Sequence, residues 1–427
     1  MNVVKVGFLG FGNVGSGAYK ILKEKRQEIF HREKINIEVA KILVRDIHKK
    51  RSVPVQPYLL TDDIEDIVNN PDISIVAEFM GGVEPARKYI LSALENKKTV
   101  VTANKELIAK HWPELEKAAQ KNGVGLYYEA SVAGGIPIIK VVNESLQAND
   151  IHEIMGIING TTNYILTKMS EEGRDYAQVL KEAQKLGYAE PDPTADVEGI
   201  DAMYKLSILA SIAFHAKVPV DFIYREGITS ITAEDIEYGK ELGYALKLLA
   251  IAKREGDAIQ ARVHPTFIPL NHPLSAVRES YNAIFIKGDA VGNMMLYGRG
   301  AGDMPTGSAI VSDIITACQQ KGAYRYTTFY NENHPSAYIC YLSNWTSEFF
   351  IRMTVRDKPG VLAKIAGVFG KYGVSIASVI QKGYGGDTAP LIFVTHPAGE
   401  LSMKSAIEDI KKEEDVLRVE NVIRVER

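Results

Sequence analysis

The chain has 427 residues, and since one domain takes roughly 150 residues, this length predicts two to three domains. Charged residues make up 24% of the sequence and hydrophobic residues 46%, as in ordinary globular proteins. The 50 Lys and Arg residues against 53 Asp and Glu residues leave a formal net charge of −3, which argues against a nucleic-acid-binding or anionic-membrane surface.

Secreted, membrane-spanning and disulfide-rich proteins are also excluded by the sequence. No apolar run approaches the ~18 residues that span a bilayer, and strand-like sequence from Val3 onward leaves no room for a signal peptide. Cys318 and Cys340 are the two cysteines, too few for a disulfide framework. We therefore expect a cytoplasmic protein.

The first 130 residues alternate between short apolar runs and amphipathic segments with helical periodicity. The apolar runs cover residues 3–9, 37–44, 73–79, 99–102 and 124–128, and the helical segments include 84–97 and 106–122. Strands that alternate with helices predict an α/β fold with a doubly wound parallel sheet of the Rossmann type. We assign residues 1–150 to this domain.

The rhythm of the chain changes near residue 151. A strand-like stretch precedes helical patterns at 161–172, 175–186, 196–215 and 233–254, and β-rich runs follow at 259–268, 281–287 and 291–297. This order predicts an α+β domain over residues 151–304. A glycine-rich loop, 298–307, leads into a helix over 308–320, and we expect the helical segment 305–321 to return to the first domain.

The C-terminal segment has a regular order of elements. Residues 322–347 show no clear periodicity and are interpreted as a connector. Residues 348–427 then read as strand, helix, strand, strand, helix and strand. This βαββαβ order predicts a small ferredoxin-like domain.

Residues 6–15, VGFLGFGNVG, join the end of the first strand to a G-x-G-x-x-G pattern. The first glycine permits a tight turn, the second lets the backbone approach a pyrophosphate, and the third allows close packing of helix on strand. The N–H groups at the helix N-terminus then face the anion. The alternative is an ordinary tight turn. The residues predicted to bind a dinucleotide here are Gly10, Phe11, Gly12, Asn13, Val14 and Gly15.

The end of the second strand bears on the choice of dinucleotide. Arg45 and Asp46 follow the strand directly. An arginine there accepts a ribose 2′-phosphate, whereas an acid bonds the 2′-hydroxyl. Because Arg45 comes first, we expect NADP(H) to be preferred, with NAD(H) as an alternative cofactor. A solvated basic loop that continues through residues 49–51 is the competing interpretation.

The stretch 183–205, AQKLGYAEPDPTADVEGIDAMYK, places several acids ahead of Lys205. Asp201 and Lys205 are one helical turn apart and share a face. A solvated salt bridge is one interpretation, but the helix continues as the nearly uncharged run LSILASIAF. A lysine at the edge of a buried surface, flanked by carboxylates, is a candidate proton donor or acceptor. The acids are Glu190, Asp192, Asp196, Glu198 and Asp201.

Four motifs in chain order make the sequence resemble the homoserine dehydrogenases. They are VVTANKELIA (100–109), YYEASVAGGIPII (127–139), GIINGTTNYIL (156–166) and the A-x3-G-Y-x-E-P-D-P-x2-D-x2-G-x-D-x3-K pattern of 183–205. The resemblance extends to about residue 321. It implies reversible, NAD(P)H-dependent reduction of L-aspartate 4-semialdehyde to L-homoserine in the biosynthesis of threonine, methionine and isoleucine. It also implies that the second domain is catalytic and mediates a homodimer or homotetramer.

The resemblance assigns roles to particular residues. Lys205 is implied to be the acid/base group, and Glu190 and Asp201 to hold the amino end of the substrate. Lys105 is implied to assist at the substrate and to contact the cofactor. Hydride transfer to the aldehyde carbon builds negative charge on its oxygen, which a neighbouring ammonium group stabilises and protonates. The reverse reaction needs a neutral amine, so we expect it to run better at high pH, unless burial lowers the pKa of the lysine.

Further ligand contacts are implied on loops. For the cofactor these are Thr102, Gly187 and Gly302, of which Gly302 lies in a glycine cluster that could equally be a plain turn. No His or Cys cluster has zinc-like spacing. The resemblance instead implies a structural monovalent cation, Na⁺, held by the Glu129 side chain and the carbonyls of Val132, Gly134 and Ile136. A glycine-rich strand exit without a cation is the alternative.

Residues 349–381, FFIRMTVRDKPGVLAKIAGVFGKYGVSIASVIQ, resemble the ACT domains, which bind a small amino acid where two copies meet. Asp357, Pro359 and Gly360 would form a loop at a helix N-terminus that is suited to a carboxylate. The resemblance implies L-threonine as a feedback effector. A ligand-free dimerisation module is the alternative.

Three other functions are less consistent with the sequence. A cofactor-sensing regulator without chemistry would not need Lys105, Glu190, Asp201 and Lys205 together. An acyl-forming semialdehyde dehydrogenase needs a cysteine nucleophile in its catalytic domain. A fused aspartate kinase would need sequence ahead of the dinucleotide motif, so we expect a monofunctional enzyme.

Overall fold

A computed structural model describes residues 3–320, 324, 339–382 and 386–427 of the chain. The chain forms two compact units, each assembled from three segments. Unit 1 comprises Met1–Ile154, Ala202–Ile223 and Tyr281–Ile339, and unit 2 comprises Met155–Asp201, Tyr224–Ser280 and Cys340–Arg427. The domain boundaries expected from the sequence stay predictions.

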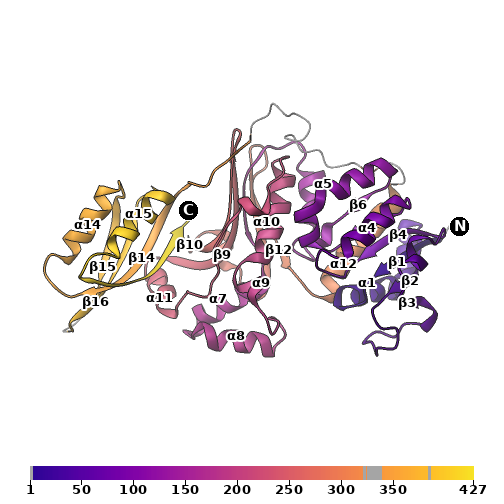
Figure 1. The fold of residues 1–427 in the computed structure, drawn as a ribbon, viewed down its shortest axis with the longest axis horizontal. Helices are drawn as coiled ribbons and strands as arrows, with labels where there is room; N and C mark the ends of the chain where they lie inside the picture. The colour runs from indigo at the N-terminus through magenta and orange to yellow at the C-terminus, as the bar shows by residue number, and fades with distance from the viewer. Residues whose placement is uncertain (1–2, 321–323, 325–338, 383–385) are drawn as a thin grey trace. The chain divides into compact units, whose positions relative to one another are not determined.

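Unit 1 contains a six-stranded parallel sheet in the order β3-β2-β1-β4-β5-β6 (Figure 1). The order reverses between β1 and β4, and ligands of open α/β sheets bind beyond the carboxyl ends of the strands at such a point. This sheet confirms the predicted Rossmann-type fold. The strands are β1 (Val3–Leu9), β2 (Asn36–Leu43), β3 (Leu60–Thr61), β4 (Ile73–Glu78), β5 (Thr99–Thr102) and β6 (Leu126–Tyr127).

Helices cover both faces of this sheet, which is why its strands are nearly continuous apolar runs. Val6 and Phe8 of β1 pack with apolar residues of α1 and α12 in one core, and the alternate residue Leu9 is also buried. A Cβ on Gly17 would lie 2.1 Å from the carbonyl oxygen of Asp303, so the backbones of α1 and α12 touch. The main helices are α1 (Asn13–Glu24), α2 (Arg26–Glu33), α4 (Ala86–Glu95), α5 (Lys105–Asn122) and α12 (Asp303–Gln319).

Two elements contain the boundary between the units. The strand β7 (Ile151–Ile157) and the helix α10 (Ile200–Ala213) each begin in one unit and end in the other. The antiparallel hairpin of β11 (Tyr281–Gly288) and β12 (Gly292–Arg299) belongs to unit 1.

The first part of unit 2 packs helices against a long antiparallel strand pair. The helices are α7 (Gly160–Glu172), α8 (Tyr176–Lys185), α9 (Thr194–Val197) and α11 (Ala233–Glu241), and the strands are β9 (Tyr244–Glu255) and β10 (Ala258–Pro269). The short strand β8 (Tyr224–Arg225) pairs with β10 in parallel.

The helix expected over 233–254 is wrong in its second half. The helix α11 ends at Glu241, Gly243 adopts a φ of +82°, and residues from Tyr244 onward form β9. The strand sequence YALKLLAIAKRE is rich in Leu, Ala and Lys, which favour helices, so local propensity pointed the wrong way. Pairing with β10 along the full length of β9 overrides that propensity.

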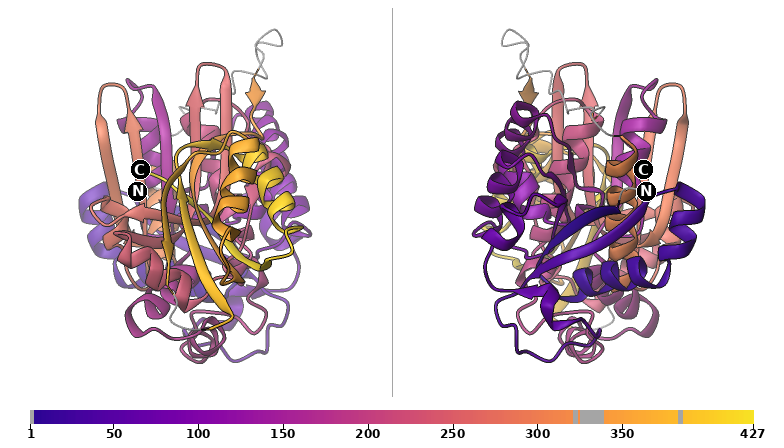
Figure 2. Two further views of the ribbon diagram at one scale, coloured as in Figure 1. Left: turned by 90° about the vertical axis from the view of Figure 1, so that its left-hand side faces the viewer. Right: turned by 90° about the vertical axis from the view of Figure 1, so that its right-hand side faces the viewer.

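The C-terminal part of unit 2 has the predicted βαββαβ order. Its strands pair antiparallel in the order β15-β16-β14-β18, and α14 and α15 share one core on the same face of the sheet (Figure 2). This arrangement confirms the ferredoxin-like fold. The elements are β14 (Thr346–Arg356), α14 (Val361–Lys371), β15 (Ile376–Gln381), β16 (Thr388–Thr395), α15 (Glu400–Ile410) and β18 (Val416–Val425).

The strand β18 also pairs in parallel with β10, through Thr266 with Arg424 and Phe267 with Val425. The C-terminal sheet is thereby hydrogen-bonded to the rest of unit 2. Most of the predicted connector 322–347 lies outside the described residues, but its described part includes the strand β13 (Cys340–Tyr341), which pairs with β10.

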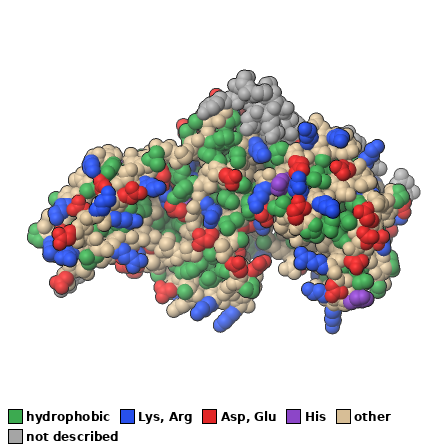
Figure 3. Space-filling model, viewed as in Figure 1, with side chains coloured by type: hydrophobic (Ala, Val, Ile, Leu, Met, Phe, Trp, Pro, Cys, Tyr) green, Lys and Arg blue, Asp and Glu red, His purple; other side chains and the backbone are tan. Residues whose placement is uncertain are grey.

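Charged side chains of both signs are interspersed over the face shown in Figure 3, as the balanced composition suggests. Within the described ranges, no helix is long and apolar enough to cross a membrane.

Candidate active site

The glycine-rich turn between β1 and α1 lies at the carboxyl end of the parallel sheet. Gly10 has a φ of +99°, and its N–H donates to the carbonyl of Leu43 at 3.0 Å. A Cβ on Gly15 would lie 3.0 Å from the carbonyl oxygen of Gly10. Gly12 caps α1 without a side chain, and a Cβ there would meet nothing within 4 Å. The open space at Gly12 and the N-terminal N–H groups of α1, including those of Asn13 and its neighbours, fit a pyrophosphate.

The loop after β2 carries Arg45 and Asp46, both exposed. Asp46 accepts a hydrogen bond from the N–H of His48 at 2.8 Å, and Arg51 donates to the carbonyls of Asp46 and Lys49 at 2.6 Å each. These bonds order the loop from within and engage Arg51. These bonds do not involve Arg45. It lies next to the end of β2, at a position suited to an anionic group of a bound nucleotide.

A buried carboxyl group, missed in the sequence, lies at the carboxyl end of β4. Glu78 is fully buried, and its carboxyl accepts hydrogen bonds from the Thr102 hydroxyl and the Met80 N–H, both at 2.6 Å. Burial raises the pKa of Glu78, and these hydrogen bonds partly offset the shift. Thr102 in turn accepts from the N–H of Asn104 at 3.0 Å, and Asn104 caps α5. This network fixes the turn that leads into the predicted site lysine, Lys105.

Unit 1 places the two predicted catalytic lysines on neighbouring helices. Lys105 is the first residue of α5, and Lys205, on α10, is only 8% exposed. The Tyr204 hydroxyl lies 3.4 Å from Oε1 of Glu106, and Nζ of Lys110 lies 5.2 Å from the centre of the Tyr204 ring. The part of α10 that carries Lys205 therefore packs against the first turns of α5.

Unit 2 holds the two predicted substrate carboxylates. Asp201, at the start of α10, is 6% exposed and accepts a hydrogen bond from the side chain of Asn159 at 3.0 Å. Glu190 is exposed in the loop after α8, where its carbonyl accepts from the Gln184 side chain at 3.1 Å. In the same loop Gly187 has a φ of +78°, as a left-handed helix end requires.

The predicted cofactor residue Gly302 is the N-cap of α12 and has a φ of +127°. Its neighbour Asp303 lies against Gly17 of α1, as described above. Gly302 is thus placed near the helix that begins at the dinucleotide motif, within unit 1.

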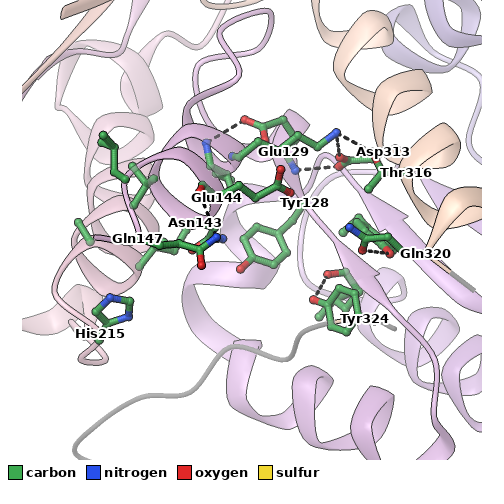
Figure 4. Close-up of a pocket in the computed structure, with 18 of the residues that line it drawn as sticks. Tyr128, Glu129, Asn143, Glu144, Gln147, His215, Asp313, Thr316, Gln320 and Tyr324 are labelled. Atoms are coloured by element: carbon green, nitrogen blue, oxygen red, sulfur yellow. Dashed lines mark hydrogen bonds and ion pairs between the residues drawn. The ribbon is translucent and has the colours of Figure 1, made fainter. Parts of the chain in front are cut away.

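The predicted cation residue Glu129 lies in a buried charged cluster beside a cavity of about 420 Å³ (Figure 4). Its carboxylate accepts from the N–H groups of Ile139 and Lys140 at 2.9 and 2.8 Å, and its own N–H donates to Asp313 at 3.0 Å. Nζ of Lys140 lies 3.2 Å from Asp313. Burial and the charge of Asp313 raise the pKa of Glu129 to about 7, and burial raises that of Asp313 to about 6.

The loop that follows Glu129 supplies the predicted carbonyl ligands Val132, Gly134 and Ile136. Gly134 has a φ of +48°, and a Cβ there would lie 2.5 Å from the carbonyl oxygen of Gly300. The carbonyl of Ile136 accepts from the N–H of Ile138 at 2.7 Å, which leaves its second lone pair. Carboxylate and carbonyl oxygens suit a hard cation. In the described part of the chain, no three His, Cys, Asp or Glu side chains are grouped to hold a metal ion.

The predicted effector loop precedes α14. Asp357, Pro359 and Gly360 are exposed, and Gly360 caps α14 with a φ of +93°. The N–H of Asp357 donates to the carbonyl of Asp387 at 3.0 Å, and its carboxylate accepts from the Gln381 side chain at 3.1 Å.

Sequence reasoning missed Glu78, Asn159 and Asp313. For Glu78 a signal was available, because an acid ends the apolar run ISIVAE. Asn159 and Asp313 act through contacts with residues distant in sequence, and neither interrupts a periodic pattern.

Comparison with known proteins gives consistent matches along the chain. The profile of the homoserine dehydrogenase NAD-binding domain matches residues 10–129, that of homoserine dehydrogenase matches 137–315, and that of the ACT domain matches 349–415. Homoserine dehydrogenase of Bacillus subtilis is 42% identical and covers 100% of this chain and 99% of its own length. That of Synechocystis is 44% identical over 97% of this chain and 98% of its own length.

Solved structures agree with these matches. A homoserine dehydrogenase from Thiobacillus denitrificans superposes with a TM-score of 0.92 at 40% identity, over 99% of this chain and 98% of that one. A hyperthermophilic archaeal homoserine dehydrogenase in complex with NADPH has a TM-score of 0.64 at 28% identity, over 76% of this chain and 99% of that one. The chain therefore belongs to the homoserine dehydrogenase family and is an NAD(P)-dependent oxidoreductase that acts on a CH–OH group and carries a C-terminal ACT domain.

Proposed function

We propose that this enzyme reversibly reduces L-aspartate 4-semialdehyde to L-homoserine, with Lys205 as the acid/base group. The observation that carries the proposal is the burial of Lys205 on α10 beside the first turns of α5. The nicotinamide, when bound, supplies the hydride. The Lys205 ammonium group stabilises the negative charge that develops on the aldehyde oxygen and donates the proton to it. Lys105 adds a second positive charge near the same oxygen.

The carboxylates of Glu190 and Asp201 bind the ammonium group of the substrate. Opposite charges of this kind hold an amino acid in one orientation. The burial of Asp201 strengthens this attraction, because little water screens a charge at such a site.

The cofactor is held by the dinucleotide motif, with its pyrophosphate on the N-terminus of α1. Arg45 at the end of β2 meets a 2′-phosphate, which favours NADP(H) over NAD(H). The remaining residues that contact the cofactor are Thr102, Lys105, Gly187 and Gly302. The archaeal relative solved with NADPH supports a phosphorylated cofactor.

A structural Na⁺ is held by Glu129 and the carbonyls of Val132, Gly134 and Ile136. The carboxyl groups of Glu129 and Asp313 are both buried, and the Lys140 ammonium group lies 3.2 Å from that of Asp313. A further positive charge there would offset their repulsion.

The ACT domain binds L-threonine at the loop of Asp357, Pro359 and Gly360, and the enzyme is a cytoplasmic homodimer or homotetramer. Feedback by threonine would fit a place in threonine, methionine and isoleucine biosynthesis. The ACT fold and the exposed left-handed Gly360 at the start of α14 support this part of the proposal.

The test is NADPH oxidation in the presence of L-aspartate 4-semialdehyde, for the wild type and Lys205→Ala. We expect the substitution to lower kcat by roughly 100-fold or more. Lys185→Ala, which removes an exposed lysine from α8, should retain full activity. A folded wild type without turnover with either cofactor would overturn the proposal and favour a sensor without chemistry.

The effector is tested in the same assay with added L-threonine. We expect inhibition of the wild type and its loss in Asp357→Ala. Equal inhibition of both proteins would remove the effector site from this loop, and no inhibition of the wild type would favour a ligand-free dimerisation module.

A further inference from the structure

Asn159, the N-cap residue of α7, has a side chain that joins two carboxylates. Nδ2 of Asn159 donates to Oδ1 of Asp196 at 2.7 Å and to Oδ2 of Asp201 at 3.0 Å. Oδ1 of Asn159 accepts from the N–H and from the hydroxyl of Thr162, both at 2.9 Å. Asn159 is 5% exposed, and its bonds to Asp201 and Thr162 are buried, whereas its bond to Asp196 is half-buried.

The orientation of the Asn159 amide is determined by its neighbours. A backbone N–H only donates, so the atom that faces the Thr162 N–H is the oxygen, and the nitrogen must face the carboxylates. Both donors and both lone pairs of the amide are then in use. Serine, threonine or aspartate would cap the helix as well, but none of them supplies two donors to the carboxylates.

The two carboxylates are close enough to repel each other. One oxygen of Asp196 and one of Asp201 bond to the same nitrogen, so they lie within two hydrogen-bond lengths of each other. Like charges at this range repel each other. A neutral group that donates to both offsets this repulsion without adding a charge.

The same turn of α7 also contacts the loop of the second substrate carboxylate. The Thr161 hydroxyl donates to the carbonyl of Tyr188 at 2.6 Å, two residues before Glu190. A Cβ on Gly160 would lie 2.8 Å from the carbonyl oxygen of Ser280, so the turn itself is held tightly against its surroundings.

We propose that Asn159 is a positioning residue for the amino end of the substrate. It acts through Asp201, by fixing the direction of its carboxylate beside that of Asp196. The inference rests on the proposed role of Asp201 in binding the substrate ammonium group.

The test compares steady-state kinetics of Asn159→Ser with the wild type. Serine retains the helix cap and has at most one O–H donor in place of the two N–H donors of the amide. Because hydrogen bonds to charged groups are the stronger ones, we expect the KM for L-homoserine to rise about 10-fold to 100-fold, with kcat and the KM of the cofactor nearly unchanged. Asn163→Ser, which removes another buried asparagine of α7 that bonds the Glu279 carbonyl, is the matched control and should leave the KM for L-homoserine unchanged.

Asp201→Asn, alone and combined with Asn159→Ser, distinguishes a failure of the role of Asn159 from a failure of the proposed role of Asp201 in substrate binding. If Asp201→Asn leaves the KM for L-homoserine unchanged, the proposed role of Asp201 fails. If it raises the KM and Asn159→Ser does not, only the role of Asn159 fails. We expect the double variant to be no worse than Asp201→Asn, and additive losses would overturn action through Asp201. Should Asn159→Ser not fold, Asn159→Thr takes its place with the same expected result.

Discussion

Arg352 of the ACT domain should contribute measurably to the stability of unit 2. The guanidinium group of this buried residue of β14 donates to Asp235 and to Glu234, both at 2.6 Å, and to the Thr232 hydroxyl at 3.0 Å. Asp235 is fully buried and closes the capping box of α11. Burial disfavours the charged guanidinium, yet the bonds and charges of these acids hold the pKa of Arg352 above its ordinary value.

The perturbation is Arg352→Met, which keeps most of the side-chain volume and removes the charge. Breaking a buried ion pair costs about 3–5 kcal/mol, because one charge is left without its partner. Asn421 continues to donate to Asp235 at 2.6 Å, so we expect a loss near the lower end, about 3 kcal/mol.

The assay is urea unfolding followed by the fluorescence of Trp345, a buried residue of unit 2, with Trp112→Phe as the common background. Lys382→Met is the matched control, because Lys382 pairs with Glu241 of the same helix through side chains that are 48% and 42% exposed. Exposed pairs contribute less than about 1 kcal/mol. A loss below about 1 kcal/mol for Arg352→Met, or an equal loss for both variants, would show that Arg352 does not stabilise unit 2 through these ion pairs.

Three further expectations follow from the geometry. Gly12→Ala should raise the KM of the cofactor without lowering Tm, whereas Gly17→Ala, whose Cβ would lie 2.1 Å from a backbone oxygen, should lower Tm markedly; equal thermal-unfolding curves would contradict this contrast. Arg45→Glu should shift the ratio of kcat/KM for NADPH over NADH by at least about 10-fold toward NADH, and an unchanged ratio would favour the solvated-loop interpretation. Burial lowers the pKa of Lys247 to about 8 from an ordinary 10.5. Between these two pH values the unfolded chain binds more protons than the folded chain, so the free energy of unfolding should rise with pH. In urea unfolding at pH 8 and pH 10.5, the wild type should show a rise of up to about 3 kcal/mol that Lys247→Met lacks. An equal rise in the wild type and the variant would exclude Lys247 as its source.

Elements with a strong local pattern could be predicted from the sequence. The parallel strands of unit 1 are apolar runs set between helices, and the ACT domain repeats a short βαββαβ order, so both folds were correctly expected. The strand β9 was not, because its Leu, Ala and Lys residues favour a helix when read locally. Only its pairing with β10 makes it a strand, and that pairing is a property of the folded chain.

The residues of the candidate site also fall into those that a local pattern predicts and those that it does not. The glycines of the dinucleotide motif are required by local backbone geometry, and the φ of Gly10 and the close approach at Gly15 show why. The network of Glu78 and Thr102 and the bridge made by Asn159 join residues that are distant in the sequence. No spacing rule within one segment reports such contacts.

Chemical rescue of Lys205→Ala tests whether Lys205 transfers the proton. The measurement is kcat for L-homoserine oxidation by the folded variant, with and without a small primary amine in solution. We expect a loss of roughly 100-fold or more in kcat, which the added amine partly restores. Turnover within about 10-fold of the wild type, with no response to the amine, would contradict it.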